Sequence, residues 1–246
     1  MRVFLFLSLF FVCDYTFASI KQDSQKCTTD LVTIDFNFSG GGNSVCEVIS
    51  SDHIKILVKP ESKDSINPSP WYAFRKSKHI KKILLELDYG EYEHRYFPKI
   101  KKINSGWERL NKSDILIKND GKNVFINFYP SKEEQYISSQ ELITEDWYED
   151  WYKILKNNKF LKSKIIGYSV QNRPIKAFFS NENINNPFIL ILGRQHPPEV
   201  SSAFALQGFI NQLIGSINLS KDFLSKYNII FVPLMLSLIH ISEPTR

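Results

Sequence analysis

The stretch FILILGRQHPPEVSSAFALQGFINQLI, residues 188–214, decides the fold of the second half of the chain. It begins with five consecutive apolar residues, 188–192, typical of a strand that is buried on both faces in a parallel sheet. After a polar turn, apolar side chains recur at helical spacing and predict one buried helix face. That face comprises Phe204, Leu206, Phe209, Ile210, Leu213 and Ile214. Residues 227–233 form the next expected strand, so the sequence predicts a βαβ unit.

Upstream of this unit, two segments predict further elements of the same domain. The segments 164–169 and 174–180 flank a polar VQNR turn and predict a hairpin. The segment 141–160 has the spacing of one or two amphipathic helices. Its apolar positions are Leu142, Trp147, Trp151, Ile154 and Leu155. Together these elements predict an α/β domain with a mixed sheet over residues 137–235.

The first half of the chain has a different pattern, with short alternating segments separated by turns. Candidate strands are 32–38, 53–58, 83–89 and 124–129. In the second of these, Ile54, Ile56 and Val58 share one face. A Gly40–Gly42 run and the turn 119–121 break the pattern. Without helical periodicity, the segment 19–136 is expected to form an all-β sandwich.

Composition excludes some classes of protein and partner. The chain has 246 residues, of which 43% are hydrophobic, so it can bury one large core or two modest ones. The net charge is +5, and the basic residues are scattered along the sequence. Clusters at 81–82 and 99–102 are interpreted as solvated faces. We therefore expect no nucleic-acid partner.

The N-terminus has the pattern of a signal peptide covering residues 1–18. One arginine precedes the apolar run 3–12, and Ala18 supplies a small residue before a possible cleavage point. A membrane anchor is the alternative, but a span needs about 20 apolar residues, and Asp14 interrupts this run. A lipoprotein would use Cys13, which bulky Val12 disfavours. The expectation is an exported protein, periplasmic or secreted, without stable membrane insertion.

Two cysteines remain once such a signal is removed. Cys27 and Cys46 form an even pair in an exported chain, so a disulfide between them is expected in an oxidising compartment. A loop of that length would contribute about 3 kcal/mol to stability. The alternative is two unpaired, small, buried thiols.

His196 and Glu199 are the candidate metal ligands. They follow the strand 188–192. In α/β folds, ligands collect beyond the carboxyl ends of the strands. Residues three apart at the start of a helix can point at one ion, and two prolines suit a helix start. The bare H-x-x-E pattern is weak, since His240 and Glu243 also fit it. A histidine satisfied by ordinary hydrogen bonds is the alternative.

Several motifs, in order along the chain, resemble the cytosolic-carboxypeptidase-like branch of the zinc carboxypeptidases. GRQHPPE at 193–199 is similar to that branch's Arg-Gln-His-Pro-Gly-Glu zinc motif. SPWYAF at 69–74 resembles a segment of its N-terminal β-sandwich. HRYFP at 94–98, Trp107 and IGYSVQNRPI at 166–175 match further landmarks. Pro198 stands where the family usually has glycine, which leaves both ligand types intact.

The resemblance implies a zinc-dependent metallocarboxypeptidase that hydrolyses the C-terminal peptide bond of a peptide or protein. His196 and Glu199 would be two ligands of Zn²⁺, and the third ligand and the catalytic residues are expected after Met235. One alternative is a zinc amidohydrolase or deacylase on the same fold. Another is a secreted binding protein whose metal site has decayed. The sequence leaves terminal-residue specificity and oligomeric state open.

Residues 236–246 read LSLIHISEPTR and resemble a translated sequencing adapter. The resemblance implies that Asn-Pro-Asp-Gly should instead follow Met235. We therefore expect an N-terminal fragment of a longer protein that has a non-native tail and lacks the catalytic residues. A divergent natural terminus is the alternative.

Overall fold

The computed structural model describes residues 25–60, 68–102, 105–169, 172–180, 185–196, 199–215 and 218–235. The expected signal peptide and the expected adapter-like tail lie outside these residues. Within them, no helix is long and apolar enough to cross a membrane.

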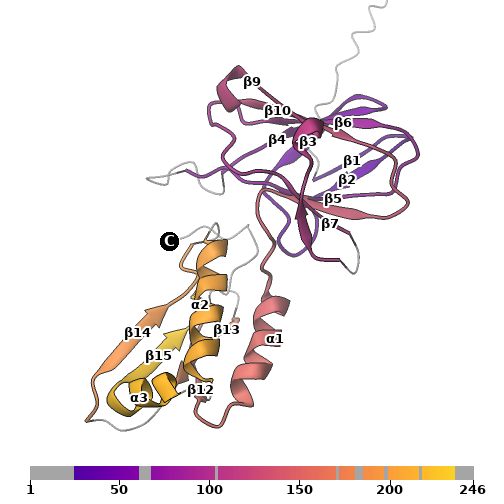
Figure 1. The fold of residues 1–246 in the computed structure, drawn as a ribbon. Coiled ribbons are helices and arrows are strands. Elements are labelled where there is room, and N and C mark those ends of the chain that lie inside the picture. The colour runs from indigo at the N-terminus through magenta and orange to yellow at the C-terminus, as the bar shows by residue number, and fades with distance from the viewer. Residues whose placement is uncertain are drawn as a thin grey trace, which may run out of the picture.

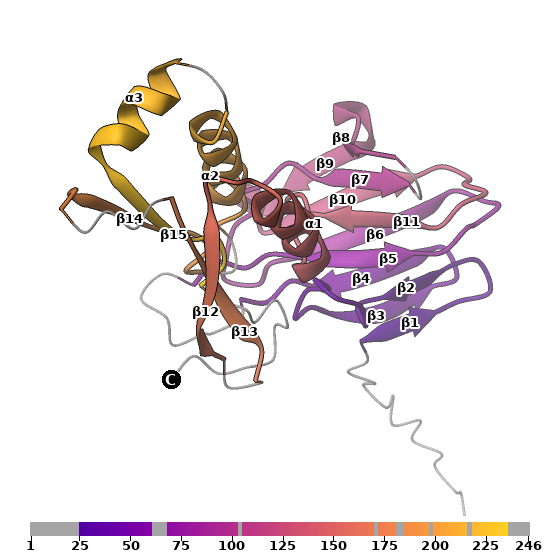
Figure 2. The same ribbon diagram turned by 90° about the horizontal axis from the view of Figure 1, so that it is seen from below.

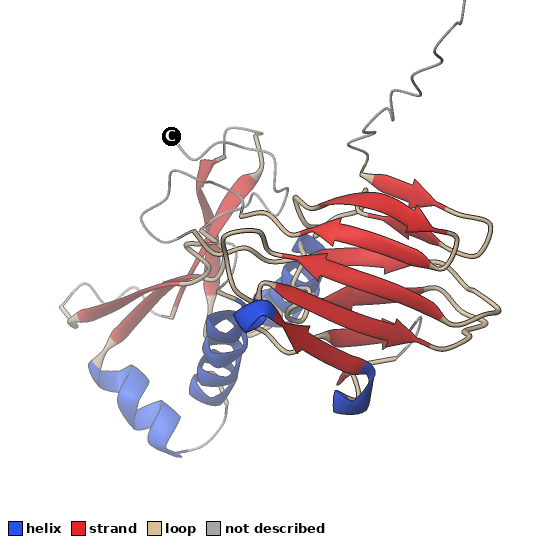
Figure 3. Cartoon of the chain, turned by 90° about the horizontal axis from the view of Figure 1, so that it is seen from above, coloured by secondary structure: helices blue, strands red, loops and turns tan. Residues whose placement is uncertain are grey.

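The first part of the chain folds into two sheets. One has six strands in the order β1-β2-β5-β11-β7-β8, all paired antiparallel. Its strands are β1 Lys26–Thr28, β2 Thr33–Asp35, β5 Ala73–Lys76, β7 Lys99–Lys102, β8 Trp107–Arg109 and β11 Gln135–Ser138. Figure 3 shows these strands running side by side in the β-rich half of the molecule.

The second sheet has five strands in the order β3-β4-β6-β10-β9, in which only β4 and β6 pair parallel. Its strands are β3 Val45–Ser50, β4 His53–Leu57, β6 Ile83–Asp88, β9 Ile115–Lys118 and β10 Asn123–Phe128. Two short 3-10 helices, η1 Lys112–Asp114 and η2 Asn119–Gly121, flank β9. The predicted turn at 119–121 is confirmed, with positive φ at Asn119, Asp120 and Gly121.

Apolar side chains from both sheets form a single core. The predicted shared face of the β4 segment is confirmed, because Ile54, Ile56 and Val58 are all buried. A disulfide joins Cys27 in β1 to Cys46 in β3, two strands of different sheets. The cross-link therefore ties the two layers of this core together.

The second part of the chain is built on a mixed four-stranded sheet in the order β12-β13-β15-β14. β12 and β13 form the predicted antiparallel hairpin, and β14 pairs parallel with β15 as the βαβ pattern predicts. The strands are β12 Lys162–Tyr168, β13 Pro174–Phe179, β14 Phe188–Leu192 and β15 Asn228–Val232. The helices are α1 Glu145–Lys156, α2 Val200–Leu213 and α3 Asn218–Lys226 (Figure 1).

Helices α1 and α2 pack against one face of this sheet and form a second core. In α1 the buried residues are Tyr148, Trp151, Tyr152 and Leu155, which recur every three to four positions. Ion pairs reinforce the contact, since Arg173 reaches Glu145 at 2.8 Å and Lys176 pairs with Glu149. Figure 2 shows both helices on the same side of the sheet.

The prediction that the strand 188–192 is buried on both faces is wrong. Phe188, Leu190 and Leu192 are 64%, 53% and 41% exposed, and Ile189 is 37% exposed. Within the described residues, helices cover only one face of the sheet, and β14 lies at its edge. β14 therefore pairs parallel with β15 although these helices cover only one face of the sheet, whereas parallel sheets are usually covered on both faces.

Three side chains assigned to buried helix faces are also more exposed than predicted. Ile154 of α1 is 59% exposed, and Phe204 and Phe209 of α2 are 38% and 47% exposed. The buried stripe of α2 is narrower, because one covering layer takes only about 100° of a helix surface. It contains Val200, Ala203, Leu206, Ile210 and Leu213. Phe204 still contacts the Trp147 ring edge-on, with centroids 5.7 Å apart.

Candidate metal centre

The turn after β14 is attached to the neighbouring strand by backbone hydrogen bonds. The Gly193 amide donates to Val232 at 2.8 Å, and the Met235 amide donates to the Gly193 carbonyl at 3.0 Å. The end of β14 and the end of β15 are therefore held together. The segment that carries His196 begins from this fixed point.

Only glycine fits at position 193. A Cβ there would lie 2.6 Å from the Pro233 carbonyl oxygen and 2.7 Å from a Leu206 methyl carbon. Both distances are shorter than real Cβ contacts, and one of the partners is backbone. The close approach of the β15 end and helix α2 thus depends on this residue.

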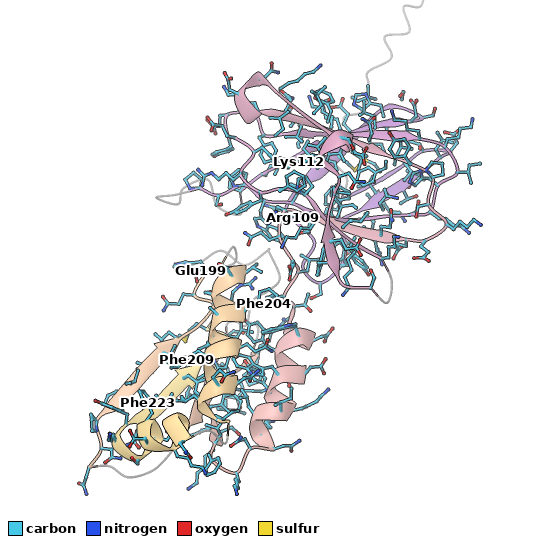
Figure 4. All side chains as sticks on the ribbon, in the orientation of Figure 1. Arg109, Lys112, Glu199, Phe204, Phe209 and Phe223 are labelled. Carbon is cyan, nitrogen blue, oxygen red and sulfur yellow. A yellow bond between two sulfur atoms is a disulfide. The ribbon has the colours of Figure 1, made fainter. Side chains whose placement is uncertain are left out.

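His196 and Glu199 lie together, as the predicted metal site requires. The imidazole Nδ1 is 2.8 Å from Glu199 Oε1. The other carboxylate oxygen accepts the amides of Gln195 and His196, each at 3.0 Å. Both side chains reach the surface at the start of α2, where Figure 4 labels Glu199.

The electrostatics of Glu199 favour its ionised form. Partial burial acts to raise its pKa, but the hydrogen bonds from the His196 side chain and from the two backbone amides outweigh that effect. The pKa of Glu199 is therefore below its usual range. An ionised carboxylate is the form that binds a metal ion.

The donor types fit zinc. An imidazole nitrogen and a carboxylate oxygen are common zinc ligands, and a catalytic site takes three protein ligands with water in the fourth position. Within the described residues, no cluster of three or more His, Cys, Asp or Glu side chains is arranged to hold a metal ion. These residues thus supply two donors, and Pro197 and Pro198 between them lie outside the described ranges.

Behind this turn is a residue whose role the sequence pattern did not reveal. Arg194 has a φ of 48° and is only 6% exposed. Burial raises the pKa of Tyr148 in α1, and the nearby Arg194 charge acts in the opposite direction. A charged residue two positions after the apolar run 188–192 was the available signal. Its burial depends on α1, which is about 40 residues away in the chain.

The aromatic residues of the SPWYAF motif lie in the core of the β-sheets or at its junction with the second part. Tyr72 and Phe74 are fully buried, with stacked rings 6.0 Å apart. Trp71 lies at the junction with the second part, beside Arg194 and Val200. These aromatic residues therefore belong to the core of the β-sheets or to its contact with the second part.

The family model that matches the chain describes a zinc-binding family, in agreement with the zinc-ligand types found at the site. Residues 148–235 match the zinc carboxypeptidase family model. This range includes His196 and Glu199, the whole four-stranded sheet, α2, α3 and most of α1. This part of the chain is therefore similar to the zinc carboxypeptidases. No curated protein matches the sequence.

Solved structures share the fold. A protein from Shewanella denitrificans OS-217 assigned as a carboxypeptidase A has a TM-score of 0.71 and 21% identity, over 83% of this chain and 55% of its own. A Burkholderia cenocepacia metallo-carboxypeptidase has a TM-score of 0.69 and 18% identity, over 85% and 57%. A Pseudomonas aeruginosa metallo-carboxypeptidase, solved with (2-guanidinoethylmercapto)succinic acid, has a TM-score of 0.68 and 16% identity, over 83% and 55%. The chain thus spans little more than half the length of these proteins.

Proposed function

We propose that the chain is part of a zinc metallocarboxypeptidase that removes residues from the C-terminus of a peptide or protein. The observation that carries the proposal is the 2.8 Å contact between His196 and Glu199 at the carboxyl end of β14, inside the range of the family match. The shared fold of three bacterial carboxypeptidases supports it. The resemblance to the cytosolic-carboxypeptidase-like branch, including its Ser-Pro-Trp-Tyr-Ala-Phe segment, refines the assignment.

In this proposal the His196 imidazole and the Glu199 carboxylate would be two of the residues that hold the ion. Zinc in such a site polarises the scissile carbonyl and lowers the pKa of bound water to about 7. The two backbone amides on Glu199 Oε2 orient the carboxylate and keep it ionised. The third ligand, the catalytic base and a cation for the substrate's terminal carboxylate belong to the complete protein. The 246-residue chain is accordingly proposed to be inactive.

We further propose that the two β-sheets form a separate domain and that the protein is exported to the periplasm or secreted. The hydrophobic core of the sheets and the core under α1 and α2 have no residue in common. The Cys27–Cys46 disulfide fits an oxidising compartment.

Zinc affinity tests the ligand assignment directly. We expect the 246-residue chain to bind zinc weakly, because two ligands leave too many positions open. His196→Ala and Glu199→Gln should each weaken that binding by roughly 100-fold, at least the loss that is typical when a residue that orients a metal ligand is changed. Competition with a chromophoric chelator measures the zinc affinity of the unmodified chain and of each variant. His240→Ala removes a histidine from the other H-x-x-E sequence and serves as the matched control. Equal zinc affinity in all three variants and in the unmodified chain would refute the assignment.

Activity requires the complete gene product. We expect it to release C-terminal residues from peptides, and chelation to stop the release until zinc is restored. Hydrolysis of N-acyl amino acids with no action on peptides would instead identify a deacylase. A complete protein that neither contains zinc nor hydrolyses peptides would be a binding protein. Zinc content and peptide hydrolysis that His196→Ala leaves unchanged would refute the assignment of His196 as a ligand of a catalytic metal.

A further inference from the structure

The end of α1 and the strand that follows it carry only positive charge. Lysines occur at positions 153, 156, 159, 162 and 164, and no acidic residue lies between 151 and 181. The acidic residues of α1 are in its first half, whereas its lysines are in its second half. Figure 1 shows α1 running away from the β-sheets, so its basic end lies near β12 at the far end of the molecule. The fold therefore gathers these lysines at one end of the second part.

The side chains of this region are exposed to solvent. Among the described strands, β12 pairs only with β13, and residues 162–166 of this edge strand are all exposed. Lys156 in the last turn of α1 and Lys159 in the connecting turn are exposed as well. We call the exposed side chains of residues 154–166 the basic edge.

Three lysines of the basic edge are not neutralised by the protein. Within the part of the chain that the structure describes, Lys156, Lys159 and Lys164 make no ion pair with a carboxylate. By contrast, Lys153 contacts Asp150 of the same helix at 2.8 Å. The basic edge therefore complements a negatively charged partner.

Large apolar side chains are interleaved with these lysines. Ile154 on α1 is 59% exposed, and Phe160 in the connecting turn is 43% exposed. Ile165 and Ile166 on β12 are 46% and 51% exposed. Exposed apolar side chains that lie close together mark a surface that binds a partner. The partner that fits this edge thus offers both negative charge and an apolar phase.

We propose that the basic edge docks on the surface of an anionic phospholipid membrane. Lysines are attracted to anionic headgroups, and their ammonium groups stay in water while apolar neighbours enter the boundary between headgroups and acyl chains. A nucleic acid offers phosphates but no apolar phase for isoleucine, and a second copy of the edge would repel the first. The contact is peripheral and needs no membrane-spanning segment.

Docking through this edge leaves the metal-site turn open to solvent. The Asn158 side chain donates to the Ile214 carbonyl at 3.5 Å, so the basic edge lies beside the C-terminal end of α2. Glu199 precedes the other end of this helix. The 14 residues of α2 separate the two sites by about 21 Å. The proposal therefore does not depend on zinc or on the proposed function.

Vesicle co-sedimentation tests the proposal. The chain from residue 19 is used, because it contains all the described residues and lacks the apolar run 3–12, which would itself bind lipid. Vesicles of phosphatidylcholine with about one third phosphatidylglycerol are compared with vesicles of phosphatidylcholine alone. The neutral vesicles report binding through apolar surface alone, such as the exposed side chains of β14. Sedimentation without vesicles corrects for self-association.

We expect about 100-fold tighter binding to the anionic vesicles at low salt. Each of the three lysines without an ion pair contributes about fivefold to this preference. Most of the preference should disappear at about 0.5 M salt, because the screening length is then shorter than the reach of these charges.

Matched lysine variants locate the contact. The combined variant Lys156→Gln, Lys159→Gln, Lys164→Gln should lose about 100-fold in affinity for the anionic vesicles. The control replaces three exposed lysines of the β-sheet part by glutamine, so that the net charge changes by the same amount, and it should lose no more than about threefold. The control positions are Lys112, which Figure 4 labels, Lys122 and Lys132.

Phe160→Ser tests the apolar part of the contact separately. It should weaken binding to the anionic vesicles about fivefold, and this factor should not change with salt, because burial of an apolar ring is not screened. Ile80→Ser, at a residue of the β-sheet part that is 83% exposed, is the control and should leave binding unchanged.

Equal binding to anionic and neutral vesicles would overturn the proposal, and so would equal losses in the lysine variant and its control. If soluble polyphosphate bound as tightly as the vesicles and Phe160→Ser changed nothing, the partner would be a polyanion in solution and the membrane assignment would be wrong. None of these measurements involves zinc or peptide hydrolysis, so a failure here leaves the proposed function to its own tests.

Discussion

Gly193 lies where the end of β15 and helix α2 come together, and its lack of a side chain decides the path of the metal-site turn. We predict that Gly193→Ala lowers the free energy of unfolding by about 1–3 kcal/mol, the usual cost of overpacking, because the Pro233 carbonyl cannot move aside. Urea denaturation measures the loss. Gly208→Ala in α2 is the control, because a Cβ there meets nothing within 4 Å. It should stabilise the chain by about 0.5–1 kcal/mol, so a loss of similar size in both variants would contradict the explanation.

Lys76 is a buried cation in the core of the β-sheets. It is fully buried, with Nζ 3.5 Å from the Ser77 carbonyl and 5.4 Å from the centre of the Phe128 ring. Burial lowers its pKa to about 8. We predict that Lys76→Met raises the free energy of unfolding at pH 7 by about 2–3 kcal/mol, since each pKa unit is worth about 1.4 kcal/mol.

The pH dependence of this gain follows from the direction of the shift. Between the folded pKa of about 8 and the unfolded value near 10.5, the unfolded chain binds more protons, so the unmodified protein becomes more stable as pH rises. The advantage of Lys76→Met should therefore shrink over that range. Denaturation at pH 7, 9 and 10 measures it. Lys82→Met, at an exposed cation 5.6 Å from the Tyr129 ring, should change stability by no more than about 0.5 kcal/mol. A constant advantage at all three pH values would show that desolvated charge is not the cause.

At the scale of elements, β14 is the strand whose environment differs most from its sequence. Phe188, Leu190 and Leu192 are exposed on an edge strand, whereas Ile191 between them packs against the core formed with α1 and α2. Exposed apolar residues on an edge strand promote association between chains. The βαβ pattern correctly identified the strand and its parallel partner. It could not show whether a second layer covers the outer face.

We predict that the 246-residue chain self-associates through this face and that Leu190→Lys reduces the association. A charge on the uncovered face is solvated in the monomer and unfavourable in an apolar contact. Sedimentation over a range of concentrations measures the effect, and dye binding to apolar surface should fall in parallel. Ile80→Lys, at a residue 83% exposed in the β-sheet part, should change neither result. A monomeric chain at all concentrations would contradict the prediction.

At the scale of the whole molecule, two cores without common residues predict two unfolding transitions. The Cys27–Cys46 bond closes a loop with a sequence separation of 19 and lies wholly in the first core. Reduction, or Cys27→Ala with Cys46→Ala, should destabilise that core by about 3 kcal/mol and leave the other transition unchanged. Calorimetry with and without reductant measures the temperature of each transition. A single transition that shifts as a unit would show that the two parts unfold together.

Features that depend on residues close together in the chain could be predicted from the sequence. Alternation in 53–58 placed Ile54 and Ile56 in a core, and the Asn-Asp-Gly turn followed from the conformations that those residues tolerate. His196 and Glu199 come together in the turn before α2, where the Glu199 amide donates to the His196 carbonyl at 3.3 Å. These features depend on neighbours in the chain, so the order of residues was enough to determine them.

Contacts between distant segments were decided only by the tertiary structure. The exposure of Leu190 and Phe209 depends on how many layers cover the sheet, and the burial of Arg194 depends on where α1 packs. A pocket lined by Ser139, Thr144 and Val200 forms because the ends of β11, α1 and α2 come together there. Periodicity identifies which face of an element is apolar. Whether that face is covered depends on segments that meet only when the chain folds, which no local pattern encodes.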